Sequence, residues 1–468
     1  MAIFLKLRSV DMDSPRLVRS IILYSLPLVF INLIQSLFNS VDMMMLDAFD
    51  GGESSVAVAA VGATSSIVHL IVNTFFGIST GTKIVLAHQL GAHHKIQVRR
   101  TVSTSIITAA VLGLVISVFG FFFSGSFLHI TKCPADCFRG AELYLKIYML
   151  GVPAIMLYNF ASAILTASGD TKRPLYYMVA SGLTNVIMNF ILLMILPEKV
   201  MAVAIATAVS QVVGAVLALT RLIRSKDMCA LDLRCLRWNL GAFKKIMKNG
   251  LPIAFCNGLL PFSNLQIQTQ LNELGSAIVA GSAACSNIEG IVSSFGSAAI
   301  SGTASVFVSY NLGAKRPERV KKSILSCLII GVSVTAVISA IALIFSRPLA
   351  SLYVSGEDAI RATQIRMLCN VTFYFVACAY SCLSHVIQSF GYSYISTINS
   401  IISVLVFRIF WMFVIYPTHR DLSAPFESLF WIVVCWPVSW CLLLIANTGI
   451  TLFLYHAKFK KGKLKSVG

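Results

Sequence analysis

Hydrophobic residues fall into twelve long runs, which short polar tracts separate along the whole chain. A helix needs about 20 mostly apolar residues to cross the hydrocarbon core of a bilayer, and each run reaches that length. The pattern therefore predicts an all-α polytopic membrane protein. The expected membrane-spanning cores cover residues 20–46, 54–79, 101–123, 140–166, 174–196, 200–222, 248–272, 277–301, 323–346, 362–388, 395–416 and 428–455.

Lys and Arg residues concentrate in alternate tracts between these runs. When the N-terminus is placed in the cytoplasm, the inner segments hold 28 of the 37 Lys and Arg residues. Cytoplasmic segments of membrane proteins carry an excess of these two residues. The distribution therefore predicts that both termini are cytoplasmic, which requires an even number of crossings and agrees with twelve.

The composition supports a lipid-facing surface. Only 12% of the residues are charged and 57% are hydrophobic, whereas a soluble domain has about 25% charged residues. The net charge of +18 lies in the tracts between runs. No basic domain remains to bind nucleic acid, so we expect no nucleic-acid partner. The first run is too long for the core of a cleavable signal peptide.

The two halves of the chain repeat each other. At a constant offset of 222, ISTGTKIVLAHQLGA from Ile78 aligns with ISGTASVFVSYNLGA from Ile300, and Gly169 aligns with Gly391. Each copy contains six runs, so the copies have the same orientation, as in transporters built from parallel repeats. The expected domains are an N-terminal six-helix bundle, a basic cytoplasmic linker, a C-terminal six-helix bundle and a basic tail. Their bounds are 1–222, 223–247, 248–455 and 456–468.

The first predicted helix carries a carboxylate at membrane depth, where ionisable groups are costly and usually functional. Gln35, Asn39 and Asp42 are spaced to share one helical face. A carboxylic acid in a low-dielectric environment holds its proton more tightly than in water, so Asp42 is a candidate proton or cation site. Pro27 removes a backbone hydrogen bond and permits bending. The alternative is that Asp42 lies near the outer interface beside Asp47.

Uncharged polar residues follow in the fifth and sixth predicted helices. Asn185 and Asn189 are an i, i+4 pair, and Thr207 lies in the next helix. They offer oxygen ligands without charge, or they make polar contacts between helices.

The second half has its own polar positions. Asn264 and Gln268 share one face of the seventh predicted helix, where they line a water-filled cavity or seal against another helix. Glu289 is a candidate second proton site, or it pairs with Arg408, in which case both are structural.

Other chemistry has little support. The chain has no nucleotide-binding loop, metal-ligand cluster or nucleophile motif, so we expect no enzyme, no resident metal and no cofactor. An ion gradient is then the natural energy source. Cys133 and Cys137 lie in an expected outer loop, where a disulfide and two free thiols remain open alternatives.

Taken in order, these motifs resemble the multidrug and toxic compound extrusion (MATE) transporters over nearly the whole chain. The resemblance is carried by the Pro27…Asp42 helix, the LGA loop of each half, ASGDTKRP before Asn185, and AIATAVSQ around Thr207. The prokaryotic DinF-like branch is most similar. Its first helix carries the acidic residue, and here Leu260 stands where the other bacterial branch has a glutamate.

The resemblance implies a V-shaped twelve-helix exporter that works by alternating access in a prokaryotic plasma membrane. It would exchange H⁺ or Na⁺ for cationic or amphipathic small molecules, as a monomer without an obligate protein partner. Asp42 would be the coupling carboxylate, and its protonation would bend the first helix near Pro27 and lower substrate affinity. H⁺ is favoured because Asn189 replaces an Asp common in relatives of this branch.

The resemblance also implies roles for neighbouring residues. Asn185, Asn189 and Thr207 would complete the coupling site. The nearby substrate cavity would be lined by Gln35, Asn39, Tyr144 and Met178.

Three other functions fit the sequence less well. A flippase for a lipid-linked oligosaccharide often has extra spans and a cationic cavity, whereas here Arg408 is the clearest intramembrane cation. A membrane-embedded enzyme would need converging catalytic groups. A channel is disfavoured by the two-part repeat within one chain.

Overall fold

A computed structural model describes residues 9–49, 56–131, 133–421 and 423–459. All regular secondary structure in these residues is helical, which confirms the all-α prediction. Eleven helical segments among them are long and apolar enough to cross a membrane, and each coincides with a predicted run. The remaining run, 248–272, lies in α8 (Leu240–Asn272). That helix is long enough to span a bilayer, but its series of Asn and Gln residues makes it more polar than the others.

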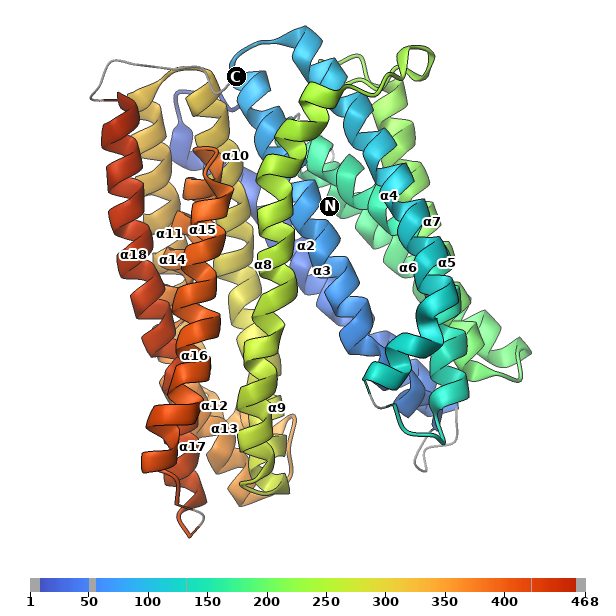
Figure 1. The fold of residues 1–468 in the computed structure, drawn as a ribbon, viewed down its shortest axis with the longest axis vertical. Coiled ribbons are helices and arrows are strands. Elements are labelled where there is room, and N and C mark those ends of the chain that lie inside the picture. The colour runs from blue at the N-terminus through green and yellow to red at the C-terminus, as the bar shows by residue number, and fades with distance from the viewer. Residues whose placement is uncertain (1–8, 50–55, 132, 422, 460–468) are drawn as a thin grey trace. The chain divides into compact units, whose positions relative to one another are not determined.

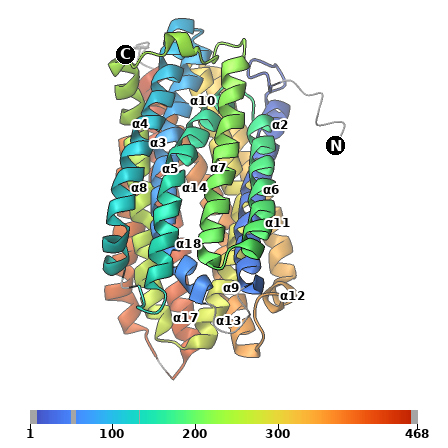
Figure 2. The same ribbon diagram turned by 90° about the vertical axis from the view of Figure 1, so that its right-hand side faces the viewer.

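The described residues form two compact units. The first unit holds Phe30–Ala254 and the segment up to Asp11. Its helix α5 packs against four neighbours and so forms the centre of this unit (Figures 1 and 2). The complete helices of this unit are α3 (Val56–Gly91), α4 (Lys95–Ile130), α5 (Phe138–Ala167), α6 (Lys172–Ile195) and α7 (Lys199–Arg224), followed by the short η1 (Leu233–Cys235).

Small residues let the central helix approach its neighbours. A Cβ added at Gly113 of α4 would lie 2.8 Å from the Cα of Pro153 in α5, and one at Gly120 would lie 2.4 Å from Met149 Sδ. Close backbone approach through small residues is the usual way that helices pack in lipid, where no hydrophobic effect drives them together.

The second unit holds Met12–Val29 and Phe255–Gly468. Its central helix is α14, which packs against α10, α11, α15 and α18. The elements are α9 (Ser276–Ser293), η2 (Ser294–Ala298), α10 (Ala299–Gly313), α11 (Pro317–Ile344), α12 (Ser346–Ser351), α13 (Glu357–Asn370), η3 (Val371–Phe373), α14 (Tyr374–Ser389), α15 (Ser393–Ser400), η4 (Ile401–Val406), α16 (Phe407–Phe410), η5 (Trp411–Ile415), η6 (Tyr416–Thr418), α17 (Pro425–Val433) and α18 (Cys435–Phe459).

Two helices are divided between the units at matching positions. In α2 (Leu17–Phe49) the division falls after Val29, and in α8 it falls after Ala254. Both positions are two residues past a proline of the repeat, Pro27 or Pro252. A proline removes one helical hydrogen bond and loosens the helix locally. The domain bounds predicted from the sequence fall between helices. They stay a prediction.

Candidate functional site

The Asp42 carboxylate is joined to the paired asparagines of α6. Asn189 Nδ2 donates to Asp42 Oδ1 at 2.7 Å and lies 3.4 Å from Asn185 Oδ1. Asn185 and Asn189 are 5% and 0% exposed, whereas Asp42 is partly exposed. The i, i+4 spacing of the asparagines puts both amides on the face of α6 that meets the C-terminal part of α2. A single, partly exposed aspartate therefore lies against a buried amide pair.

The network continues into α7 and α5. Asn185 Nδ2 lies 3.5 Å from Thr207 Oγ1, and Thr207 donates in turn to the carbonyl oxygen of Val203 at 2.9 Å. The buried phenol of Tyr144 lies within electrostatic reach of Asp42 and stacks near Tyr148, with ring centroids 6.1 Å apart. Five residues to which the resemblance assigned roles, Asp42, Asn185, Asn189, Thr207 and Tyr144, are thus brought together from four helices.

One buried acceptor in this cluster is unused. Asn189 Oδ1 is fully buried and has no hydrogen-bond partner among the described residues. A buried amide oxygen without a partner is costly, and such groups in native structures usually have a functional explanation or an unseen ligand. The atom therefore adds a free oxygen ligand beside the carboxylate.

Glycine at position 182 sets how closely α2 approaches α6. A Cβ added there would lie 1.7 Å from Cε2 of Phe38, so the phenyl ring lies directly over the glycine. Phe38 precedes Asp42 by four residues and therefore lies on the same face of α2. This contact places the C-terminal part of α2, and with it the carboxylate, against the asparagine pair.

We expect Gly182→Ala to push the Phe38 ring off α6 and to weaken the Asp42–Asn189 contact. Transport should fall roughly tenfold, because a misplacement of about 1 Å in a binding constellation costs up to about 100-fold. The measurement is initial efflux rate in proteoliposomes, at equal amounts of folded protein. The double variant Gly182→Ala/Phe38→Ala supplies the control, since removing the ring makes room for the methyl group and should restore transport. Failure of the double variant to recover would show that this contact does not position α2.

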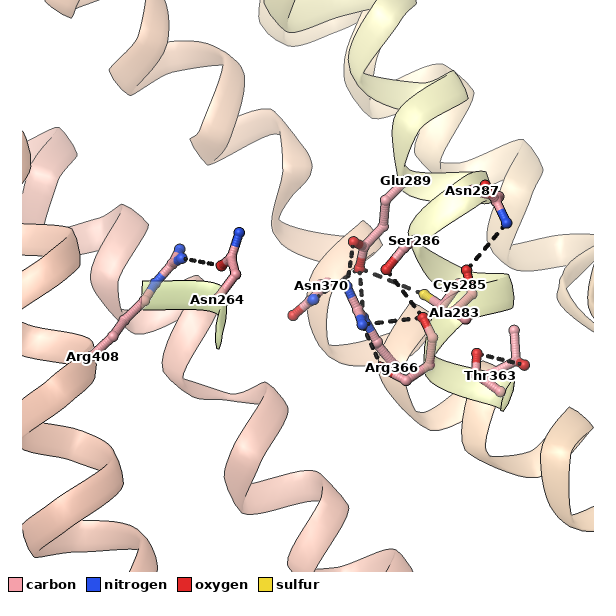
Figure 3. Close-up of polar contacts among 12 residues, drawn as sticks. Asn264, Ala283, Cys285, Ser286, Asn287, Glu289, Thr363, Arg366, Asn370 and Arg408 are labelled. Atoms are coloured by element: carbon pink, nitrogen blue, oxygen red, sulfur yellow. Dashed lines mark hydrogen bonds and ion pairs between the residues drawn. The ribbon is translucent and has the colours of Figure 1, made fainter. Parts of the chain in front are cut away.

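A second polar cluster lies in the second unit, around Glu289 of α9 (Figure 3). Its carboxylate forms a two-pronged ion pair with Arg366 of α13, at 3.2 Å from Nε and 2.8 Å from Nη2. Asn370 Nδ2 donates to the same carboxylate at 2.8 Å, and the Cys285 thiol lies 3.5 Å away. The pairing of Glu289 with Arg408 considered from the sequence is therefore wrong, since Arg366 neutralises this carboxylate.

Arg408 stands apart from that pair (Figure 3). It is 6% exposed, yet no carboxylate among the described residues lies within ion-pair distance of it. Its guanidinium donates from Nη1 to Asn264 Oδ1 and from Nε to Ser439 Oγ, both at 3.2 Å. Its carbon Cζ also lies 5.8 Å from the Trp436 ring centroid, and that of Arg366 lies 4.6 Å from it. The second unit thus contains a buried positive charge held by neutral partners.

The remaining predicted residues lie outside these two networks. Gln35 is exposed on α2 and Met178 is partly buried on α6, and no described hydrogen bond joins Gln35 to Asp42. The side chain of Asn39 lies outside those that the structure describes. Gln268 is exposed on α8 and donates to Asn272 Oδ1 at 2.9 Å. Pro27 is buried in the N-terminal part of α2.

Sequence reasoning missed two members of the second cluster. Arg366 lies inside the predicted run 362–388, and the rule that flags ionisable groups at membrane depth would have found it there. Trp436 carries no comparable signal, because aromatic residues are common in apolar runs.

Cys133 and Cys137, in the loop between α4 and α5, are free thiols in the structure, with their Sγ atoms 3.8 Å apart. Burial, together with the neighbouring Cys137 and Asp136, raises the pKa of Cys133 to about 11. This thiol is therefore protonated at neutral pH and a poor nucleophile.

Comparisons with known proteins agree with this architecture. The MatE family model matches the chain twice, over residues 27–191 and 252–414. The probable multidrug resistance protein YpnP of Bacillus subtilis is 24% identical over 315 residues, or 67% of this chain and 69% of the relative. The probable multidrug resistance protein NorM of Thermotoga maritima is 24% identical over 411 residues, or 85% of each chain. An FAD transporter of Shewanella oneidensis is 24% identical over 381 residues, or 78% of this chain and 82% of the relative.

Solved structures show the same fold. An outward-facing multidrug resistance MATE family transporter of the MOP superfamily superposes with a TM-score of 0.84 at 20% identity, over 93% of this chain and 96% of that one. A MATE structure described as being in the bent conformation gives 0.84 at 18% identity, over 94% and 97%. These relatives are transporters rather than enzymes. Because one family model matches each half of the repeat and together the matches cover most of the chain, this protein belongs to the MatE family of multidrug and toxic compound extrusion transporters.

Proposed function

We propose that the protein is a secondary exporter that exchanges inward-moving H⁺ for small amphipathic molecules, with Asp42 as the coupling carboxylate. The observation that carries the proposal is the 2.7 Å contact between this carboxylate and Asn189, in a cluster that has no other charged group among the side chains that the structure describes. Several relatives are named as multidrug resistance or multidrug export proteins. The inner orientation of both termini and a prokaryotic plasma-membrane location belong to the same proposal.

A proton suits this cluster better than a sodium ion. Sodium binding needs several oxygen ligands, and in a membrane interior a second carboxylate helps to offset the loss of its hydration shell. Here Asp42 is the one carboxylate among the described residues of the cluster, and its described bond is with the amide nitrogen of Asn189. The other oxygens of the cluster, such as Asn189 Oδ1 and Thr207 Oγ1, are neutral. Proton transfer needs only the single carboxylate, whose protonation removes a charge that is costly at membrane depth.

Coupling would act through the division of α2. The part before Phe30 belongs to the second unit, and the part that carries Asp42 belongs to the first. A change in the charge of Asp42 alters how strongly the C-terminal part of α2 is held to α6, and Pro27 lets that part move separately. Proton and substrate are coupled only as far as they favour different states of this element.

Replacing Asn189 with Asp should change the coupling ion. We expect Asn189→Asp to gain Na⁺-dependent efflux, because it supplies a second carboxylate oxygen where Oδ1 already lacks a partner. The measurement is efflux driven by an imposed Na⁺ gradient at equal pH on both sides, compared with the unchanged protein. Asn185→Asp gives a matched control at the neighbouring position. If the efflux rate does not depend on the Na⁺ gradient in either variant, the cluster is not a cation site.

The direct test of the proposed function is transport by the purified protein in proteoliposomes, with pH and Na⁺ gradients imposed separately and a panel of cationic dyes. Saturable efflux that follows the pH gradient supports exchange. Non-saturating ion flux without exchange would indicate a channel and overturn the proposal.

Arg408 favours a second substrate class. A buried guanidinium with only neutral partners can bind a carboxylate or phosphate group in two-pronged fashion. One relative is named as a transporter of FAD, which carries phosphate groups. Anionic and zwitterionic dyes therefore belong in the same panel. Preference for them, lost in Arg408→Gln while cationic dyes are still exported, would identify this class.

A further inference from the structure

The start of α2 and the start of α11 border a groove on the surface of the second unit. Its volume is about 670 Å³. At one end its lining includes the basic residues Arg16, Arg19 and Lys322, and further along it includes Ile22 and Leu325. All five side chains are exposed. The groove is thus bounded by two helices that lie about 300 residues apart in the sequence.

The lining changes from charged to apolar along the helices. Lys322 lies in the second turn of α11, whereas Ile329 lies about twelve residues, or roughly 18 Å, from the helix start. Arg19 and Ile22 follow the same order on α2, which runs in the same direction from its start at Leu17. A cationic end followed by an apolar length of this size matches the headgroup and upper acyl chains of a phospholipid.

The three basic residues, Arg16, Arg19 and Lys322, have no ion-pair partner among the described residues. The N-termini of two helices lie at the same end of the groove and add their positive dipole ends. Basic recesses between membrane helices are suited to anionic lipid headgroups.

Hydrogen bonds and an ion pair hold the segment before α2 in place beside the groove. Arg319 Nη2 donates to the carbonyl oxygen of Met12 at 2.8 Å. Asp13 pairs with Arg316 at 2.6 Å and accepts from the Tyr310 hydroxyl at 2.7 Å. These contacts fix the start of α2 against α10 and α11. The groove is therefore formed before a ligand arrives, and binding costs little ordering of the protein.

We propose that this groove binds an anionic phospholipid, with its phosphodiester at Arg16, Arg19 and Lys322 and an acyl chain along Ile22, Leu325 and Ile329. The lipid would brace the N-terminal part of α2 against α11. The site is independent of the Asp42 cluster and of the ion that drives transport, because none of its residues belongs to that cluster.

The test uses the full chain in detergent, with long-chain phosphatidylglycerol as the probe and binding followed by native mass spectrometry and by thermal shift. We expect phosphatidylglycerol to bind and to raise the melting temperature, and phosphatidylcholine to do neither. The triple variant Arg16→Gln/Arg19→Gln/Lys322→Gln should bind about 100-fold more weakly, because each basic residue near an anionic lipid contributes about fivefold in affinity. Unchanged binding by this variant would overturn the proposal.

Two further arms separate the alternatives. The variant Arg99→Gln/Arg100→Gln/Lys321→Gln loses the same charge at exposed positions outside the groove and should bind as the unchanged protein does. An equal loss in this control would mean that net charge, and not the groove, attracts the lipid. Inorganic phosphate and the soluble glycerophosphoglycerol headgroup should compete poorly. Full competition by either would make the groove an anion site and not a lipid site.

Discussion

Replacing Asp42 with Asn is expected to abolish efflux driven by a pH gradient while the protein stays folded. The substituted amide keeps an oxygen that accepts from Asn189 Nδ2, so the contact between α2 and α6 can persist. What disappears is the change of charge, because an amide neither binds nor releases a proton near neutral pH. The initial rate should fall at least about 100-fold, to the level of vesicles without a gradient, if protonation supplies the usual coupling free energy.

The measurement is dye efflux from proteoliposomes over a range of imposed pH gradients, with folding checked by size-exclusion chromatography and thermal melting. Glu142→Gln is the matched control, because Glu142 is a partly exposed carboxylate of the same unit whose ion pair among the described residues is with Lys146 on its own helix. That variant should transport normally. Normal pH-driven efflux by Asp42→Asn would remove Asp42 from the coupling mechanism.

The second large effect is expected on stability, from breaking the Glu289–Arg366 pair. Glu289→Gln leaves the Arg366 guanidinium buried without its counter-charge. Removing one partner of a buried ion pair costs about 3–5 kcal/mol, which corresponds to a drop in melting temperature of roughly 5–10 °C. The double variant Glu289→Gln/Arg366→Gln should recover part of this loss, because no unpaired charge is then left in the interior.

Melting temperature in one detergent, measured for all variants together, tests this expectation. Arg347→Gln is the control, since the Arg347–Glu357 pair of the same unit is exposed and such pairs contribute little. Its melting temperature should not change measurably. If Glu289→Gln melts like the unchanged protein but loses transport, the pair acts in transport and its role is not structural.

The sequence predicts the candidate site more completely in the first half of the chain than in the second. Asn185 and Asn189 are identified by their spacing. Residues four apart share a helical face, so both side chains face the same neighbouring helix. That Asp42 lies on this neighbouring helix was implied only by the resemblance to a family. For Glu289 the sequence offered Arg408 as a partner, and the structure instead brings Arg366 to it from a helix much nearer in the chain.

The unbonded Asn189 oxygen and the close fit of Phe38 over Gly182 had no sequence signal. A glycine in a membrane helix is common, and its spacing does not reveal which side chain lies over it. Similarly, the polar character of α8 was visible in its Asn and Gln residues, but their exposure and the Gln268–Asn272 bond were not.

The amino-acid order alone is enough to derive the helical class, the positions of the apolar spans and the parallel repeat. A segment that crosses a bilayer must be long and apolar, and its backbone groups must form hydrogen bonds within the segment. Both requirements can be recognised from the residues of that segment alone. The division of α2 and α8 between two units, the partner of Glu289 and the lipid-sized groove between α2 and α11 were decided only by folding. Each of these depends on which distant segments meet, and helical periodicity specifies the face that a residue occupies but not the side chain that it will contact.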